Sequence, residues 1–406
     1  MRTSASPPAV DSGRGWIVVG AAFLSTFTVF GIVYSFGAFF DSMAEDLGSG
    51  KGATALMFSI TTCWYFVLGI VAGRAADRFG PRPVLVVGAV ALGVGLLTTS
   101  RVESIWVGYV TYGALVGTAV ACAYVPMVAT VGGWFVTRRT AALGVAVAGI
   151  GTGTLVVVPL SERLIDAYGW RTAYVVLGVG GTLLLFVASL AASRPPIDTT
   201  QEAVPLGRIV RQRGFVVMYA ATVLGSLALF LPFVFIADYA EDRGASPAGA
   251  AALVGIIGAA SVVGRLGLGA LGARFGPARL TQFSFITLTA SFVLWLVAGS
   301  SYPLLVAFAT VMGIGYGGFI ALAPAVMATL FGTVGLGAIL GALYTAAGIG
   351  GLFGPPIAGA LIDRTSYATT IVAAMVVFAA ASAVLFLLPP APARTPAASA
   401  GAAGVR

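Results

Sequence analysis

Long apolar segments separated by short polar stretches run through most of the 406-residue chain. A helix that crosses a lipid bilayer needs about 20 consecutive apolar residues. The apolar runs are continuous rather than alternating, which favours membrane helices over the strands of a β-barrel. The pattern predicts an all-α integral membrane protein with twelve transmembrane helices, at residues 16–40, 53–73, 83–100, 105–131, 140–161, 171–192, 214–237, 248–271, 280–299, 303–330, 335–361 and 368–388.

The composition narrows the class of protein further. Hydrophobic side chains make up 59% of the chain and charged ones 9%, whereas soluble domains carry about 25% charged residues. This excludes a soluble enzyme and a disordered chain. The formal net charge of +8 does not indicate a nucleic-acid partner, because the basic residues lie in small groups between apolar runs. The expected surroundings are a lipid bilayer.

The basic residues also predict an orientation. Of the 22 lysines and arginines, 15 fall on one side of the predicted spans and 6 on the other, and Arg265 lies within a span. Loops rich in Lys and Arg stay in the cytoplasm. We therefore expect a multi-pass protein of the bacterial inner (plasma) membrane with both termini cytoplasmic.

Two short sequences occur twice in the same order. RFGP at residues 78–81 recurs at 274–277, and LID at 164–166 recurs at 361–363. Because the offsets are nearly equal, we interpret the chain as two related six-helix halves. The expected parts are an N-terminal half at 1–192, a cytoplasmic linker at 193–213, a C-terminal half at 214–388 and a disordered Pro/Ala-rich tail at 389–406.

The polar loop GRAADRFGPR, residues 73–82, is a candidate gate. Glycine allows two helices to turn tightly, and an aspartate at a helix end pairs with arginine across a moving interface. The alternative is a basic loop that only sets the topology. The second copy of the loop has Ala273 in place of the aspartate. The candidate gating residues are Gly73, Asp77, Arg78, Gly80 and Arg82, together with the pair Arg138 and Arg139.

The same loop matches the G-x-x-x-D-R-x-G-x-R signature of the major facilitator superfamily, whose members have twelve helices in two parallel halves. Within it, the chain resembles the monocarboxylate porter family, including bacterial monocarboxylate and oxalate-formate carriers. DSGRGW at 11–16 is similar to the family's sequence at the first helix. Tyr124 and Pro126, followed by Arg138 and Arg139, are similar to its helix 4–5 signature, and Gly264-Arg265 to its helix 8 arginine site.

Arg265 is the strongest candidate for substrate binding. A charged group deep in a bilayer costs at least about 2.5–3.5 kcal/mol, so Arg265 should face a cavity or a partner. A guanidinium binds a carboxylate through a two-pronged fork, and the family resemblance implies a carboxylate-binding arginine here. The alternative is that the side chain extends along the helix to the nearer membrane surface, roughly 10 Å away.

Six further residues are candidates to line the same site. A buried phenol needs a partner for its hydroxyl, which the substrate or a backbone carbonyl supplies. Phe235 stands where many relatives of the family carry histidine, which suits a larger or less polar acid than lactate. The candidates are Tyr34, Tyr124, Tyr316 and Tyr344, Ser261 one turn from Arg265, and Phe235.

Chemistry of other kinds has little support. The chain has no histidine, and its two cysteines lie far apart in apolar segments. We expect no catalytic residue, metal site or cofactor, and no phosphate-binding loop is present. Proton coupling stays open, because either the substrate carboxylate or one of Asp41 and Asp238 has to carry the proton. One chain contains a complete pathway, so a monomer suffices.

The sequence thus predicts a secondary active transporter of small organic anions, in the first place a monocarboxylate, that works by alternating access. Proton symport is one open mode. The main alternative keeps the fold and makes the protein an exporter of drugs or metabolites without a carboxylate requirement. A membrane sensor and a membrane enzyme are weaker alternatives, since the chain has neither an appended signalling domain nor paired carboxylates within its spans.

Overall fold

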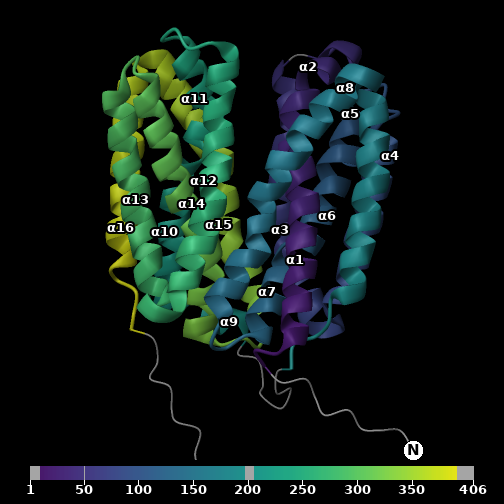
Figure 1. Ribbon diagram of the computed structural model, residues 1–406, viewed down its shortest axis with the longest axis vertical. Helices are drawn as coiled ribbons and strands as arrows, with labels where there is room; N and C mark the ends of the chain where they lie inside the picture. Colours follow the sequence, from purple (N-terminus) through teal and green to yellow (C-terminus); the bar gives the residue numbers. More distant parts are fainter. Residues whose placement is uncertain (1–9, 50, 197–204, 391–406) are drawn as a thin grey trace, which may run out of the picture.

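The computed structural model describes residues 10–49, 51–196 and 205–390, and these residues form helices and loops without a β-strand. Figure 1 shows two helical bundles side by side. The first contains α1 (Gly13–Tyr34), α2 (Phe36–Asp46), α3 (Lys51–Phe79), α4 (Pro81–Thr99), α5 (Ile105–Gly108), a π-helix (Tyr109–Val116), α6 (Gly117–Ala123), α7 (Val125–Trp134) and α8 (Arg139–Ala191). The second contains α10 (Arg213–Leu229), α11 (Leu231–Glu241), α12 (Pro247–Phe275), α13 (Pro277–Ala298), α14 (Tyr302–Phe331), α15 (Leu336–Arg364) and α16 (Tyr367–Leu385).

Eleven helices of the described chain are long and apolar enough to cross a membrane. One of them, α8, has 53 residues, which at a rise of 1.5 Å per residue is about 80 Å and exceeds the roughly 30 Å of a bilayer core. Its backbone is broken at Gly169, where φ is 77° and ψ is 159°. Because α8 therefore holds two spans, the eleven helices supply the twelve predicted crossings.

The repeated RFGP sequence makes the same turn in both bundles. Gly80 separates α3 from α4 with a φ of 93°, and Gly276 separates α12 from α13 with a φ of 82°. Glycine adopts these positive angles without the strain of a side chain. The proline that follows begins the next helix, where its missing N–H costs no hydrogen bond. The two loops are therefore equivalent structures at equivalent places.

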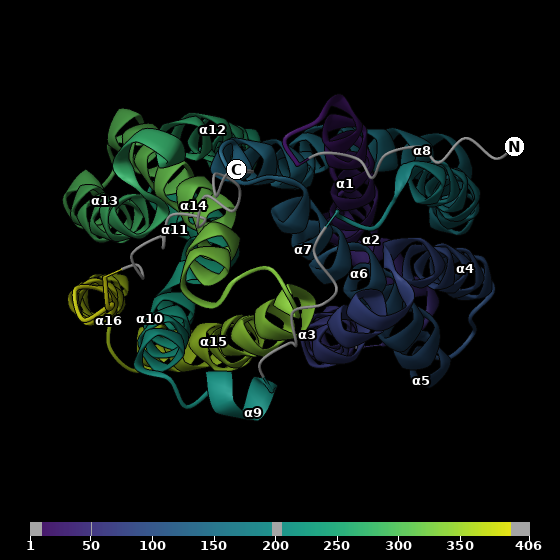
Figure 2. The ribbon, with the colours of Figure 1, turned by 90° about the horizontal axis from the view of Figure 1, so that it is seen from below.

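The two bundles touch mainly along two pairs of helices, with smaller contacts of α14 and α15 on α7 and α8. α3 packs on α15, and α8 packs on α12, as Figure 2 shows from below. These contacts use small residues, because a Cβ on Gly73 would overlap the Gly337 carbonyl and one on Gly272 would overlap the Thr140 side chain. In Figure 1 the ribbons meet at the end where α1 begins and α16 ends, and stand apart at the other end. We refer to these as the termini end and the far end.

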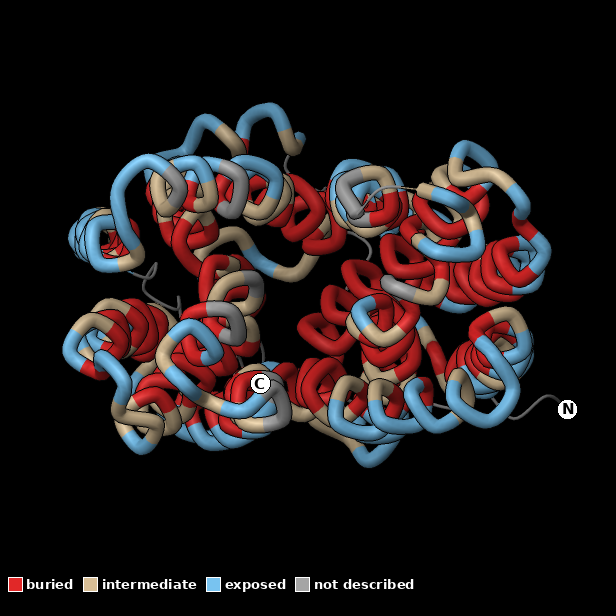
Figure 3. Tube along the Cα trace, turned by 90° about the horizontal axis from the view of Figure 1, so that it is seen from above, coloured by how far each residue is buried: buried red, intermediate tan, exposed pale blue. Residues whose placement is uncertain are grey.

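The linker between the bundles contains the short helix α9 (Leu206–Ile209), while residues 197–204 and the tail from 391 lie outside the described part. Exposed apolar side chains such as Val67, Leu183 and Val187 lie on the outer surface. Figure 3 shows the exposed residues around the rim and the buried ones inside each bundle and toward the middle. A surface this apolar fits a protein surrounded by lipid.

Candidate functional site

Arg265 of α12 is fully buried, with none of its surface exposed. Its Nη1 donates a hydrogen bond to the Ser261 hydroxyl at 3.1 Å. Its Nε and Nη2 have no partner among the described residues. The side chain therefore stays inside the protein instead of reaching the membrane surface. Buried donors are nearly always satisfied, so these two N–H groups mark a place for an acceptor.

Glycines on the neighbouring helices create the space in which Arg265 lies. Within its own half, a Cβ on Gly264 would overlap the carbonyl of Ile314 on α14. From the other half, Gly151 of α8 faces the guanidinium, and a Cβ there would lie 2.9 Å from Nη1. Small residues let membrane helices approach closely. As a result, Arg265 lies at the interface between the two halves.

Tyrosines from both halves surround the guanidinium. The ring of Tyr316 on α14 lies with its centroid 5.3 Å from the Arg265 Cζ, within the range of a cation–π contact. Tyr34 at the end of α1 interacts electrostatically with Tyr316 and with Arg265, and so does Tyr124. Tyr124 stacks on Tyr344 of α15 with ring centroids 5.3 Å apart. The structure thus places Tyr316, Tyr34 and Tyr124 near Arg265 and joins Tyr344 to them through Tyr124.

Local breaks in the helices place two of these rings. α1 ends at Tyr34, and α2 begins after Ser35. Tyr124 separates α6 from α7 with a ψ of −70°, directly before Val125 and Pro126. Proline lacks a backbone N–H and disfavours helical geometry in the residue before it, so a kink is expected near Tyr124.

Ser261 has a different role from the tyrosines. Its hydroxyl donates to the Gly258 carbonyl at 2.6 Å and accepts from Arg265. Both hydrogen bonds join residues of α12. Ser261 therefore holds one N–H of the guanidinium in place and leaves the other edge open.

The structure adds residues that the sequence did not single out. Tyr65 of α3 is buried and interacts electrostatically with Tyr34, Tyr124 and Tyr316. Phe30 of α1 lies edge-on to Tyr124 at 5.1 Å and edge-on to Tyr65 at 6.1 Å. The signal available in the sequence was the helical spacing of Phe30 and Tyr34, which are four residues apart and share a helix face.

Phe233, two residues before the predicted Phe235, is the α11 residue that reaches the cluster. Its ring lies edge-on to Tyr316 with centroids 5.6 Å apart. The Phe235 ring instead points toward α15, where a Cβ on Gly359 would lie 3.5 Å from it. The described contacts therefore place Phe233, rather than Phe235, beside the tyrosines.

The candidate gate lies at the termini end. The Asp77 carboxylate accepts a hydrogen bond from the N–H of Ala338 at 3.2 Å, in the first turn of α15. Gly335, the residue that caps α15, has no side chain to offer. Asp77 therefore caps a helix of the other half and lies at its positive dipole end. Gly73, one turn earlier, allows the close approach to Gly337.

The other residues of the predicted loop make contacts that differ from that of Asp77. The carbonyl of Arg78 accepts a hydrogen bond from Arg194 Nη2 at 2.7 Å. Gly80 makes the turn described above, and Arg82 is exposed at the first turn of α4. Arg74 and Arg78 also line a cavity of about 370 Å³ beside Asp77.

Arg138 and Arg139 begin α8, and Asp11 binds the loop before them. The Asp11 carboxylate accepts hydrogen bonds from the backbone N–H groups of Val136, Thr137 and Arg138, at 3.3, 3.1 and 3.4 Å. Burial raises the pKa of Asp11, but these bonds and the Thr137 hydroxyl outweigh it, so the pKa lies below its ordinary value. Arg139 Nε donates to the Phe135 carbonyl at 2.8 Å.

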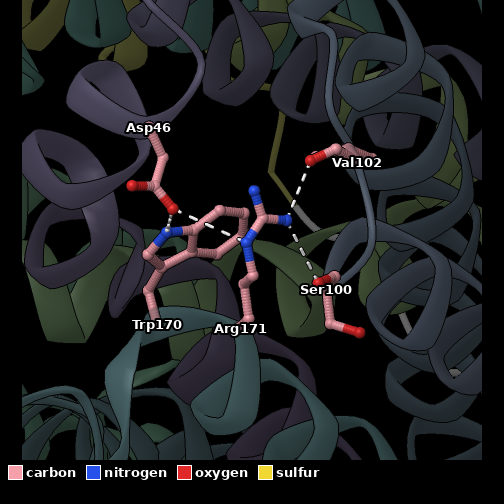
Figure 4. A network of polar contacts seen from close by, with 5 residues as sticks. All are labelled: Asp46, Ser100, Val102, Trp170 and Arg171. Carbon is pink, nitrogen blue, oxygen red and sulfur yellow. Dashed lines mark hydrogen bonds and ion pairs between the residues drawn. The ribbon is translucent and has the colours of Figure 1, made fainter.

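A polar network stabilises the far end of the first bundle (Figure 4). Asp46 accepts a hydrogen bond from Trp170 Nε1 at 2.8 Å and pairs with Arg171 at 3.5 Å. Arg171 also donates to the carbonyls of Ser100 and Val102, at 3.3 and 2.9 Å. Three separate segments of one half are thereby joined away from Arg265.

The described residues provide neither a metal site nor a view of the two aspartates that the sequence offered as proton carriers. They contain no group of histidine, cysteine and carboxylate side chains that is able to hold a metal ion. Asp41 and Asp238, which the sequence offered as proton carriers, belong to α2 and α11, and their side chains lie outside the described part.

Comparisons with known proteins agree with this architecture. The model of the Major Facilitator Superfamily matches residues 22–277 and 218–405. Monocarboxylate transporter 3 of Rattus norvegicus is 32% identical over 379 residues, covering 89% of this chain and 76% of the relative. Monocarboxylate transporter 13 of Bos taurus is 30% identical, covering 96% and 92%.

A solved structure has the same fold. The major facilitator transporter FucP, crystallised in the outward conformation, superposes with a TM-score of 0.73 at 16% sequence identity. The superposition covers 92% of this chain and 99% of FucP. At this identity the likeness concerns the fold alone.

Proposed function

Because this chain belongs to the major facilitator superfamily, as a transporter of the monocarboxylate type, we propose that it carries small organic anions, in the first place monocarboxylates, across a membrane by alternating access. It is a multi-pass membrane transporter and not an enzyme. The proposed moving units are the halves at residues 1–192 and 214–388.

The observation that carries this proposal is the unsatisfied edge of Arg265. Two of its nitrogens, Nε and Nη2, lack a partner among the described residues. These two nitrogens lie on the same edge of the planar guanidinium. A carboxylate binds such an edge by accepting two parallel hydrogen bonds. In this proposal Arg265 binds the carboxylate.

The rings around the guanidinium then select the remainder of the acid. Tyr344 has a buried hydroxyl beside the Tyr124 phenol that meets no complete hydrogen-bond geometry among the described residues, while Phe30 and Phe233 offer apolar edges. Such a lining favours an acid with an apolar or aromatic body over a small hydroxy acid. The hydroxyl of Tyr344 is positioned to recognise a single polar group on it.

The contacts at the termini end supply the gate. Asp77 caps α15 from the opposite half, and Gly73 allows the halves to touch there. When the halves rock, this cap breaks and the termini end opens. We infer that the termini end is cytoplasmic, that the membrane is the bacterial inner membrane and that a monomer is the working unit. The cap then closes the cytoplasmic side in the described conformation.

Uptake into proteoliposomes tests the proposal. Labelled lactate, pyruvate and benzoate are supplied to vesicles that contain the purified protein, and Arg265→Gln and Arg265→Lys variants are measured in parallel. We expect Arg265→Gln to abolish uptake, and Arg265→Lys, which keeps the charge but loses the fork, to retain a small part of it. Circular dichroism and gel filtration show whether the variants are folded.

The exporter alternative makes the opposite forecast. It requires that neutral or cationic compounds move and that Arg265→Gln leaves their movement unchanged. That outcome, with no uptake of any of the three acids, would overturn the carboxylate assignment.

A further inference from the structure

The turn between α11 and α12 lies at the far end of the second bundle (Figure 1) and holds Arg243. The Arg243 Cζ lies 3.6 Å from the ring centroid of Tyr239 and 5.7 Å from that of Tyr367, the first residue of α16. Its Nη1 donates a hydrogen bond to the Tyr239 carbonyl at 3.2 Å. Two aromatic rings and a backbone carbonyl therefore hold the guanidinium in one place.

The first bundle has a similar arrangement at its own far end. In both halves the fourth residue after the aspartate of LID is aromatic, Trp170 in the first and Tyr367 in the second. The Arg171 Cζ lies 4.3 Å from the Trp170 ring, and the Arg243 guanidinium approaches Tyr367. Asp46 completes the arrangement of the first half, since its carboxylate pairs with Arg171 and accepts a hydrogen bond from Trp170.

No described carboxylate takes the place of Asp46 in the second bundle. The one ion pair of the described chain is that of the first bundle. Glu241 and Asp242 come directly before Arg243, but both are exposed and neither pairs with it. In the described part of the chain, Arg243 makes one hydrogen bond, to a backbone carbonyl. Its remaining N–H groups are therefore available to an acceptor from outside the protein.

A cavity of about 280 Å³ lies beside Arg243. Its lining includes Ser246 and Ser300, and Leu305 adds an apolar side chain. The Ser246 hydroxyl accepts a hydrogen bond from a backbone N–H of α12 at 3.2 Å, and a hydroxyl that accepts is still able to donate. A guanidinium and hydroxyls around a hollow with an apolar side suit a small organic anion, whose carboxylate accepts the hydrogen bonds.

From these contacts we propose that Arg243 forms a second carboxylate-binding site, which holds a small organic anion at the position that Asp46 fills in the first bundle. The site is separate from Arg265. From Pro247, where α12 begins, to Arg265 the helix rises about 27 Å at 1.5 Å per residue. The proposal therefore does not depend on the carboxylate-binding function of Arg265.

Chemical modification of single arginines tests the site in the wild-type protein. Phenylglyoxal reacts with accessible guanidinium groups, and peptide mass spectrometry measures the rate at each arginine of the full chain in phosphatidylcholine nanodiscs. We expect saturating benzoate to slow the modification of Arg243 at least about tenfold, because at ten times the Kd about a tenth of the sites are free. Arg101, an exposed arginine after α4, should react at an unchanged rate. Sodium chloride at equal ionic strength should protect neither.

Two variants at Ser246 test whether the missing group is a carboxylate. Aspartate and asparagine begin a helix about as well as serine, so the start of α12 is retained in both. Ser246→Asp places a carboxylate in the cavity, and we expect slow modification of Arg243 that benzoate does not slow further. Ser246→Asn adds no charge and should be protected by benzoate as the wild type is. Equal behaviour of the two variants would contradict the proposal.

The outcomes separate this site from Arg265 and from lipid. Arg265→Gln should leave the protection of Arg243 intact, whereas loss of protection in that variant would trace the effect to substrate at Arg265 and overturn the second site. No protection in any sample would overturn it as well and leave the transport proposal standing. Protection by inorganic phosphate or by phosphatidylglycerol in the nanodiscs, but not by benzoate, would assign the site to a phosphate group and overturn the carboxylate assignment. Equal protection by chloride would mean screening and no site.

Discussion

Tyr124 and Tyr344 stack across the interface between the two halves, with ring centroids 5.3 Å apart and ring planes inclined by 20°. Tyr124 lies at the kink between α6 and α7, and Tyr344 lies on α15. Since one ring belongs to each half, rocking of the halves changes the geometry of this pair. The pair is therefore a contact that reports on both the site and the conformational change.

The hydroxyl of Tyr344 is expected to contribute to affinity. It is buried with the Tyr124 phenol as its polar neighbour and meets no complete hydrogen-bond geometry among the described residues, so a substrate that hydrogen-bonds to it gains about 0.5–1.5 kcal/mol. Tyr344→Phe keeps the stacked ring and should raise KM by a factor of about 2–13 with little change in maximal rate. Uptake kinetics with labelled acids measure this.

Tyr112 provides the matched control for that substitution. Its hydroxyl is also buried without a partner among the described residues, but its ring packs on Phe36 and Tyr174, away from Arg265. Tyr112→Phe should leave KM unchanged. A similar rise in KM for both variants would show that loss of a buried hydroxyl acts through the fold and not through the substrate.

The glycine that faces the guanidinium is expected to be sensitive to a single methyl group. A Cβ on Gly151 would lie 2.9 Å from Arg265 Nη1 and 2.6 Å from Val262 Cγ2. Gly151→Ala should displace the arginine and lower the uptake rate by at least about tenfold, since misplacement of a binding group by about 1 Å has effects of this size or larger. Gly180→Ala, at a position with open space in the second span of α8, should be neutral.

Much of this architecture could be predicted from the sequence. The twelve spans follow from the lengths of the apolar runs. Arg265 was recognisable because a charge within such a run is costly unless it faces a cavity or a partner. The turn at Gly80 was readable from its repetition at Gly276. The first two signals depend only on residues close in the chain, and the third depends on comparing two parts of the same sequence.

The composition of the aromatic cluster was harder to predict. Tyr65 lies in an apolar run that gives no sign of which side of its helix faces the other half. Phe233 and Phe235 are two residues apart, which places them about 200° apart around a helix. α10 ends at Leu229 and α11 begins at Leu231, and it is Phe233 whose ring lies against Tyr316. Which side of a helix faces the site depends on how that helix packs against its neighbours.

The cap that Asp77 provides for α15 should set the balance between conformations. Loss of a cap to alanine costs about 0.5–2 kcal/mol, so Asp77→Ala should shift the equilibrium toward opening at the termini end by a factor of about 2–30. Accessibility of a cysteine introduced at Ala338 measures this shift. Glu103→Gln, an exposed carboxylate outside this contact, is the control. Unchanged labelling of the introduced cysteine would exclude Asp77 as a gate residue.

Asp11 is expected to stabilise the folded protein in a pH-dependent manner. Its pKa in the folded state lies below the ordinary value of 3.8, because the hydrogen bonds from residues 136–138 outweigh the effect of burial. A carboxyl with a depressed pKa stabilises the fold above its unfolded pKa, and this stabilisation is lost as the pH falls through its folded pKa. Asp11→Asn should therefore unfold at a lower temperature than wild type at pH 7, and the difference should shrink below about pH 4.

Asparagine is the suitable replacement at this position. The backbone of Asp11 has a positive φ of 58°, which asparagine tolerates nearly as well as aspartate, so the comparison removes the charge and one acceptor oxygen without adding backbone strain. Thermal unfolding in detergent at pH 7, 5 and 3 measures the difference. An equal loss at all three values would mean that the carboxylate charge does not contribute, and that the N-terminal segment is held to the loop before α8 by its backbone bond from Asp11 to Trp134.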